Sequence, residues 1–356
     1  MLTSLKLRSM QRSQKEGESM VSRVLPTEFQ QWLLSCAVLW FMTGFFLDGW
    51  AHNHIPALET FFTVWHAVFY SGYFFIVASL VGITLSQRGK QGGSFLAAIP
   101  FGYDTAMIGV VVFAVGGLGD LVWHEFFGVE KTIEALLSPT HLILAVGGCL
   151  MITANLRVWF LTLPPLGVPK FVDQVPMLFS LASMLSTLAF FTQFSHVITV
   201  RAGGEPPVLQ MIEVSQSAAI TGYLFDTVLM LGCFLLIARR AKLAIGACTF
   251  VLTLPMLAMA LMRDGLLIVP SAFIMGLVGD AFTRNIFPFE LHARRVRLLC
   301  CSVASTFFLC YFVTIACTSG IWWSVHLWTG SIVMSGLTGL LLSYLVLPPK
   351  ENSGAN

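Results

Sequence analysis

Ten long apolar segments limit what this chain can fold into. They lie at about residues 30–48, 61–86, 105–127, 139–161, 173–199, 213–238, 243–262, 264–283, 296–317 and 323–347. A helix needs about 20 residues to cross the hydrocarbon core of a bilayer, and each segment is near that length. Because the bilayer core holds no water to satisfy backbone groups, such segments span it as helices. The sequence therefore predicts an all-α, polytopic membrane helix bundle of about ten transmembrane helices.

The composition supports a membrane protein. Only 11% of the 356 residues are charged and 56% are hydrophobic, whereas a soluble domain carries about 25% charged residues. The sequence contains no nucleic-acid-binding motif and no glycine-rich phosphate loop, so we expect a lipid bilayer as its partner and no nucleic acid. The eight cysteines show no Cys-x-x-Cys spacing and are expected to act as small apolar residues.

The basic residues predict the orientation of the chain. Ten spans place both termini on one side, and all but three of the 20 Lys and Arg residues fall on that side. The three exceptions are Lys131, Arg201 and Arg263. Because cytoplasmic loops carry the excess of Lys and Arg, we expect a multi-pass protein of the inner (cytoplasmic) membrane with both termini in the cytoplasm.

The same reading divides the chain into four regions. We expect a basic cytoplasmic tail at 1–28, a transmembrane double hairpin at 29–165, an additional transmembrane bundle at 166–348 and a short cytoplasmic tail at 349–356. The double hairpin holds the features that point to a function.

Two stretches of this double hairpin repeat the same order of polar side chains. They consist of Asp48, His52, Glu59 and His66, and of Asp120, His124, Glu134 and His141. In each stretch the Asp precedes the first His by four residues, so both side chains share one face of a helix. The predicted topology places both stretches at the outer face of the membrane. Charged side chains inside apolar segments are costly and indicate a function.

The residue types of the two stretches predict metal binding. Neutral imidazole together with carboxylate suits a first-row transition metal such as copper, iron or zinc. Each Glu is either an extra ligand or an acceptor that orients a ligand His. The spacing leaves open whether the stretches form two sites or share one. Asp48 and Asp120 lie 72 residues apart, the length of one hairpin, so the hairpins can pair about a two-fold-like axis.

The two stretches resemble a known family. Asp48-x3-His52, followed by Phe62-Thr-Val-Trp-His66, resembles the first copper motif of the C subunit of particulate methane and ammonia monooxygenases, Asp-x3-His-x12-His. Asp120-x3-His124, followed by Glu134-Ala-Leu-Leu-Ser-Pro-Thr-His141, resembles the second motif of that subunit, Asn-x3-His-x13-His. The chain departs from the family in its histidine spacings, x13 and x16, and in having Asp120 in place of Asn. The resemblance covers about residues 30–165.

The resemblance implies two copper sites and a copper membrane monooxygenase. Asp48, His52 and His66 would bind one copper, and Asp120, His124 and His141 a second. Glu59 and Glu134 would neighbour these sites. The implied activity is O2-dependent hydroxylation of a small apolar substrate, such as ammonia, methane or a short hydrocarbon. Companion monooxygenase-like subunits are implied as partners, because the sequence shows neither a soluble copper domain nor a site for a reductant.

Two other functions remain open at the level of sequence. The first is a membrane protein that transports or handles copper or another metal, and the second is a metal-dependent membrane hydrolase that uses zinc-activated water. The predicted outer loops are poor in Met, whose thioether selects Cu(I), and this weighs against copper uptake.

One further acidic residue lies in the predicted spans. Asp226 falls midway along the sixth apolar segment. A carboxylate in this position faces the bundle interior or a water-filled path. We therefore expect Asp226 to be either an intramembrane relay or a neutral, hydrogen-bonded group.

Overall fold

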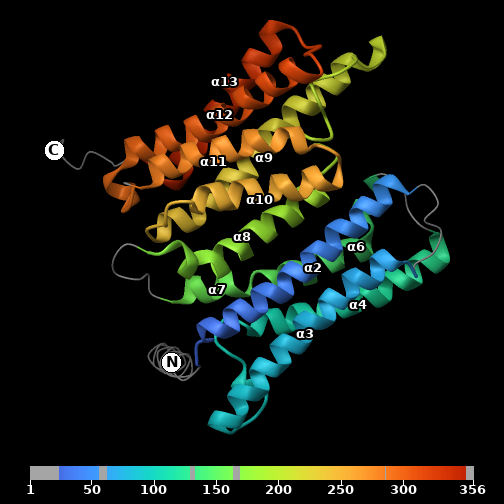
Figure 1. Ribbon diagram of the computed structural model, residues 1–356, viewed down its shortest axis with the longest axis vertical. Helices are drawn as coiled ribbons and strands as arrows, with labels where there is room; N and C mark the ends of the chain where they lie inside the picture. The colour runs from blue at the N-terminus through green and yellow to red at the C-terminus, as the bar shows by residue number, and fades with distance from the viewer. Residues whose placement is uncertain (1–23, 56–61, 129–132, 163–168, 285, 350–356) are drawn as a thin grey trace, which may run out of the picture.

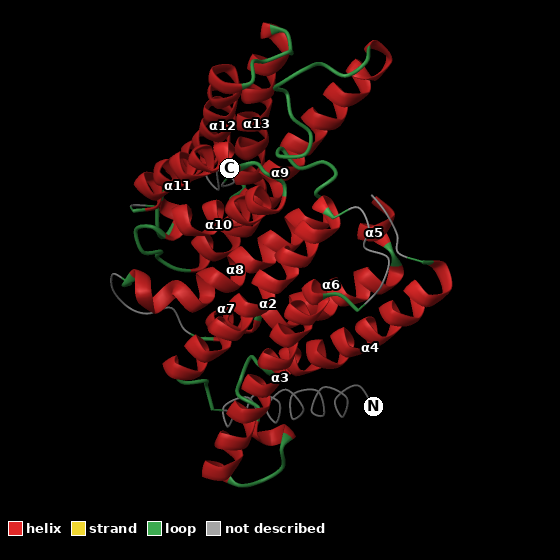
Figure 2. Cartoon of the chain, turned by 45° about the vertical axis from the view of Figure 1, so that its right-hand side comes forward, coloured by secondary structure: helices red, strands yellow, loops and turns green. Residues whose placement is uncertain are grey.

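The computed structural model describes residues 24–55, 62–128, 133–162, 169–284 and 286–349. Its described part is mainly helical and contains no strand (Figure 2). The exception is one isolated antiparallel bridge between Gly203 and Ile321. The prediction of an all-α bundle is confirmed.

The helices follow the predicted apolar segments closely. They are α2 (Glu28–His54), α3 (Val64–Gln91), α4 (Asp104–Phe127), α5 (Ile133–Leu137), α6 (Pro139–Ile152), α7 (Ala154–Leu161), α8 (Phe171–Phe191), α9 (Ile212–Arg240), α10 (Ala247–Met262), α11 (Val269–Thr283), α12 (Ala293–Thr318) and α13 (Val325–Val346). Short 3-10 turns precede α4, α9, α11 and α12 at Leu96–Ala98, Leu209–Met211, Leu266–Ile268 and Phe289–Leu291.

Eight described helices are long and apolar enough to cross a membrane when α9 and α11 are counted together with the 3-10 turns that precede them. The bent pair α6 and α7 makes a ninth span if the two helices are counted as one. The seventh apolar segment, 243–262, forms α10, which is helical for only 16 residues. Gly246, with φ +95°, precedes α10, and the Asp280 carboxylate accepts hydrogen bonds from the Cys248 and Thr249 N–H groups. These contacts fix the start of α10 inside the apolar segment, because the carboxylate satisfies N–H groups that have no partner within the helix.

The fourth span is bent by 47° between α6 and α7, which the sequence pattern did not predict. The Thr153 hydroxyl donates to the Cys149 carbonyl at the break. Arg157 lies one turn further on, and its guanidinium donates to the Leu150 carbonyl at 2.7 Å and to the Thr153 hydroxyl at 2.7 Å. Side chains that hydrogen-bond to backbone carbonyls inside a helix disturb its regular hydrogen bonds and are a recognised cause of kinks.

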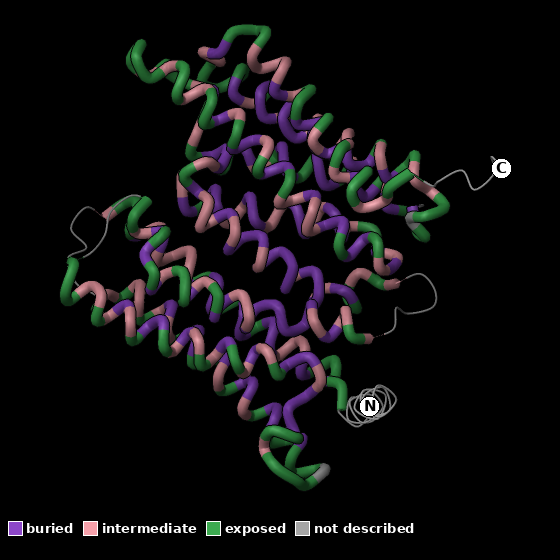
Figure 3. Tube along the Cα trace, turned by 180° about the vertical axis from the view of Figure 1, so that it is seen from behind, coloured by how far each residue is buried: buried purple, intermediate pink, exposed green. Residues whose placement is uncertain are grey.

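The helices pack in two groups that follow chain order (Figure 1). One buried apolar cluster joins α2, α3, α4, α6 and α7, and a second joins α8 to α13. Helices α8 and α10 lie along the junction and contact α2. In Figure 3 the residues that face the neighbouring helices are buried, whereas the outward faces of the outer helices are exposed.

The exposed outer faces carry many large apolar side chains. Examples are Phe74, Val111, Leu118, Phe273, Leu309 and Leu341, whose exposed fractions run from 47% to 69%. Exposing such apolar faces to water is unfavourable, whereas exposing them to lipid is not. The length and composition of the helices thus indicate a multi-pass membrane protein.

The two N-terminal hairpins are built alike. In the α2–α3 hairpin, Gly72 lies so close to Phe41 that a Cβ on it would sit 2.5 Å from the Phe41 Cα. In the α4–α6 hairpin, a Cβ on Gly147 would sit 2.5 Å from the Phe113 backbone nitrogen. Both contacts occupy the same places relative to the repeated stretches, because each Gly follows the second His by six residues and each Phe precedes the Asp by seven. The repeat therefore includes the helix packing as well as the polar side chains.

Candidate metal centre

The first cluster forms where α2 ends and α3 begins. Asp48 and His52 share one face of the last turns of α2, and His66 lies in the first turn of α3. The Thr63 hydroxyl caps α3 by accepting a hydrogen bond from the His66 N–H at 3.1 Å. The Asp48 Oδ2 lies 3.8 Å from the His52 Nε2 and 3.5 Å from the His66 Nε2.

The second cluster repeats this construction between α4 and α6. The Asp120 Oδ2 lies 3.4 Å from the His124 Nε2, and its Oδ1 lies 3.2 Å from the His141 Nε2. The Ser138 hydroxyl caps α6 by accepting a hydrogen bond from the His141 N–H. The Thr140 hydroxyl donates to the Asp120 Oδ1 at 2.8 Å, which fixes the carboxylate.

The two clusters have nearly the same geometry. The imidazole rings of His52 and His66 lie 5.9 Å apart at 59°, and those of His124 and His141 lie 5.8 Å apart at 57°. In each cluster the three candidate ligand atoms lie within 4.8 Å of one another. The structure thus brings together all six residues predicted as ligands, as two separate triads.

The imidazoles of the second triad are held by backbone carbonyls. The His141 Nδ1 makes a short hydrogen bond to the Ala135 carbonyl, and the His124 Nδ1 lies 3.2 Å from the Gly128 carbonyl. A carbonyl only accepts, so each Nδ1 carries the proton. With the proton on Nδ1, the Nε2 of each ring faces Asp120 and can serve as a ligand.

The donor set fits a small transition-metal ion. Donors bound tetrahedrally to one ion at about 2.0–2.1 Å lie about 3.3 Å apart, and the carboxylate–imidazole distances here run from 3.2 to 3.8 Å. The Asp48 Oδ1 is buried and has no hydrogen-bond partner within the described residues. Such an oxygen is costly unless a cation or a donor satisfies it. Asp48, His52 and His66 would hold one ion, and Asp120, His124 and His141 a second.

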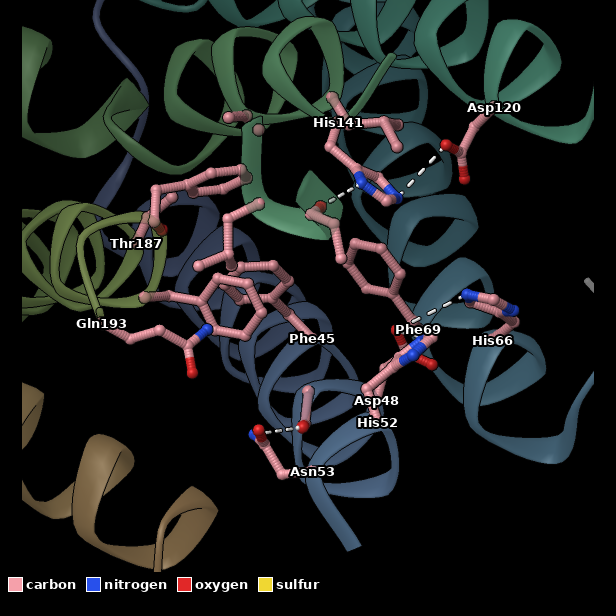
Figure 4. Close-up of a pocket in the computed structure, with 18 of the residues that line it drawn as sticks. Phe45, Asp48, His52, Asn53, His66, Phe69, Asp120, His141, Thr187 and Gln193 are labelled. Carbon is pink, nitrogen blue, oxygen red and sulfur yellow. Dashed lines mark hydrogen bonds and ion pairs between the residues drawn. The ribbon is translucent and has the colours of Figure 1, made fainter. Parts of the chain in front are cut away.

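Both triads open into one cavity of about 620 Å³. Figure 4 shows Asp120 and His141 on one part of its wall and Asp48, His52 and His66 on another, with Phe69 between them. Most other wall positions are aromatic or aliphatic, namely Phe41, Phe45, Phe69, Tyr70, Phe113, Leu144, Phe190, Phe191 and Phe194. The triads therefore form two distinct sites that face the same apolar space.

The C-terminal bundle supplies one wall of this cavity. Thr187, Phe190 and Phe191 project from the end of α8, and Gln193 lies in the turn that follows. At the mouth, the Arg263 guanidinium donates to the Asn53 Oδ1 at 2.6 Å, and the His54 Nε2 lies 2.7 Å from the Asp264 Oδ2. Sequence reasoning missed this wall. The one sequence feature that could have indicated this wall is a group of polar residues, among them Gln193 and His196, at the end of the fifth apolar segment.

The remaining predicted site residues lie elsewhere. The Glu134 side chain is exposed on α5 and is absent from the described lining of the cavity, where its neighbour Ala135 provides the carbonyl that holds His141. Glu59 lies outside the described residues. Asp226 is buried in α9, accepts a hydrogen bond from the Val197 N–H at 3.1 Å and faces a separate cavity of about 10 Å³.

His196 also lies apart from both triads. It is buried, and its Nδ1 accepts a hydrogen bond from the Ile198 N–H at 3.3 Å. The described lining of the large cavity does not include it. Within the described residues, His196 therefore has a structural role and is not part of the candidate metal centre.

Comparison of the chain with protein-family models, curated proteins and solved structures finds no match. The functional argument accordingly rests on the two triads and their shared cavity.

Proposed function

We propose that this chain is a copper-binding integral membrane protein of the copper membrane monooxygenase type, acting in O2-dependent hydroxylation of an apolar substrate. One observation carries the proposal: two matching Asp-His-His triads face a single, mostly apolar cavity. The sequence resemblance to the C subunit of methane and ammonia monooxygenases points to the same chemistry.

Copper is the metal we favour for both triads. Each triad offers two imidazole nitrogens and one carboxylate oxygen, a donor set that binds Cu(II) most strongly among the divalent first-row ions in a general N/O site. Zinc and iron also bind such sets. The family resemblance selects copper among the three.

The residues of this chain have separable roles in that activity. The Asp and His side chains would hold the ions, and bound copper would supply O2 activation with electrons from an external reductant. The phenylalanine side chains would exclude water and hold the substrate, as expected of a pocket lined by apolar groups with a few polar ones. Companion monooxygenase-like subunits are the partners we propose for delivering the electrons.

The orientation in the membrane is part of the proposal. The basic residues favour a cytoplasmic location for both termini and the outer face of the inner membrane for the triads. We expect a reporter that is active only in the cytoplasm to be active when fused after Asn356. A reporter fused at the same point that is active only outside the cytoplasm would overturn the topology.

Elemental analysis of the protein purified in lipid tests the proposal directly. We expect about two copper ions per chain, because each triad has its own donor set, and an electron paramagnetic resonance signal with nitrogen hyperfine structure from the imidazoles. Zinc in place of copper would instead favour a membrane hydrolase with a metal-activated water. A protein that binds no metal after incubation with copper would refute the proposal.

A further inference from the structure

Within the described residues, the side-chain amide of Gln193 in the shared cavity has no hydrogen-bond partner. Gln193 follows the last turn of α8, and its backbone is fixed by hydrogen bonds from its N–H to the Phe190 carbonyl and from the His196 N–H to its own carbonyl. Its side chain is only 6% exposed and lines the cavity. The described residues provide no hydrogen bond to its amide, although a buried primary amide can make up to four.

Several other polar groups of this wall already have partners. The Thr187 hydroxyl donates to the Ser183 carbonyl at 3.0 Å, and Asn53 and Arg263 are hydrogen-bonded to each other. The Gln193 amide is open to the cavity, so a group that enters the cavity can hydrogen-bond it. The position of the Gln193 amide therefore points to a molecule that enters the cavity and satisfies it.

The cavity is larger than the smallest substrates require. At about 620 Å³ it falls within the range of about 300–1,000 Å³ that is usual for sites of drug-sized molecules. Methane or ammonia would leave most of it unfilled even with both ions bound. The walls contributed by α2, α3 and α8 are rich in phenylalanine, so the bulk of the occupant is apolar.

We propose that the cavity binds a neutral, largely hydrocarbon molecule of about ten non-hydrogen atoms or more that carries one hydroxyl or carbonyl group, and that the Gln193 amide hydrogen-bonds this group. This deepens the proposed function by assigning its substrate class. A neutral amide both donates and accepts, and in apolar surroundings it selects a neutral polar group over a charged one.

The arrangement also sets the direction in which the molecule lies. Figure 4 places Gln193 and Thr187 on the α8 side of the cavity, across Phe45 from Asp48 and His66. A molecule anchored by its polar group at Gln193 directs its hydrocarbon end toward the triads. Gln193 is thus a specificity-determining residue, and oxidation is directed to carbons remote from the polar group.

Photolabelling with 3-azioctanol, an eight-carbon alcohol that carries a diazirine, tests the proposal in the full-length protein in lipid nanodiscs. We expect label on peptides that contain Phe190 to Phe194 and on the end of α2. Excess 1-octanol should suppress this labelling, and octane at the same membrane concentration should compete about three- to tenfold less well, because it makes no hydrogen bond.

The variant Gln193→Leu keeps the size of the side chain and removes the amide. We expect it to weaken competition by 1-octanol by about three- to tenfold, with no change for octane and no loss of bound copper. The matched control Gln210→Leu changes an exposed residue outside the described cavity lining and should behave as the wild type. Equal competition by octane and 1-octanol in the wild type, or identical behaviour of the two variants, would overturn the inference.

Bound copper is counted on the same samples, so the two proposals fail separately. Selective octanol binding without copper would support the assigned ligand class and refute the copper site. Copper binding without selective octanol competition would support the copper sites and refute the assigned ligand class.

Discussion

Changing His124 and His141 together to alanine is expected to lower bound copper from about two ions per chain to about one, and the double variant of His52 and His66 is expected to do the same. Each pair shares a single carboxylate partner, Asp120 or Asp48. Removing both imidazoles leaves that carboxylate as the only one of the three predicted donors, which is too few to retain a transition-metal ion. Elemental analysis and the nitrogen hyperfine structure of the resonance signal measure the change.

A histidine outside the triads provides the matched control. His54 lies two residues beyond His52 at the same end of α2 and pairs with Asp264 instead of with a triad. We expect His54→Ala to retain both copper ions. Loss of both ions from either double variant would show that the two triads depend on each other, and unchanged copper in both double variants would show that the repeated side chains are not ligands.

The sequence predicted the helices and the six candidate ligands for one physical reason. In lipid, the length of an apolar segment and the spacing of its polar residues directly constrain the structure. The four-residue spacing from Asp to His placed each pair on one helix face. These are local properties, and a single sequence displays them.

The contacts that sequence reasoning missed are long-range or made by the backbone. The Ala135 carbonyl accepts the hydrogen bond from His141, which was one of the two roles considered for Glu134. A backbone acceptor leaves no residue-type signal in a sequence. The wall that contains Gln193 comes from a helix more than 100 positions away along the chain from the first triad. The 16-residue α10 depends on a cap from Asp280, which lies in the following helix. None of these pairings follows from local spacing.

The glycine contacts in the two hairpins lead to the second large expected effect. We expect Gly147→Ala to remove copper from the second triad and leave the first triad occupied. A Cβ at this position would lie 2.5 Å from the Phe113 backbone nitrogen and 2.8 Å from its Cα. Backbone atoms cannot rotate away as a flexible side chain can, so α4 and α6 must separate. This overpacking costs about 1–3 kcal/mol, and it shifts Asp120 relative to His141, because the two residues lie on different helices.

The neighbouring residue offers a stringent control. A Cβ on Gly148 would meet only the Phe41 ring, at 3.7 Å, which is ordinary van der Waals contact. Gly148→Ala should therefore keep both copper ions, although the two glycines are adjacent on α6. Copper per chain, measured on the folded fraction from size-exclusion chromatography, distinguishes the two variants.

The other hairpin supplies the reciprocal test. Gly72→Ala would place its Cβ 2.5 Å from the Phe41 Cα and should empty the first triad only. If Gly147→Ala prevents folding, Gly116→Ala is a milder change in the same hairpin, because its closest contact is 3.0 Å to the Leu144 nitrogen. Loss confined to one triad in each hairpin would mean that close helix packing sets the separation of the ligands, as small residues at membrane helix interfaces allow. Equal copper content in the Gly147 and Gly148 variants would contradict that mechanism.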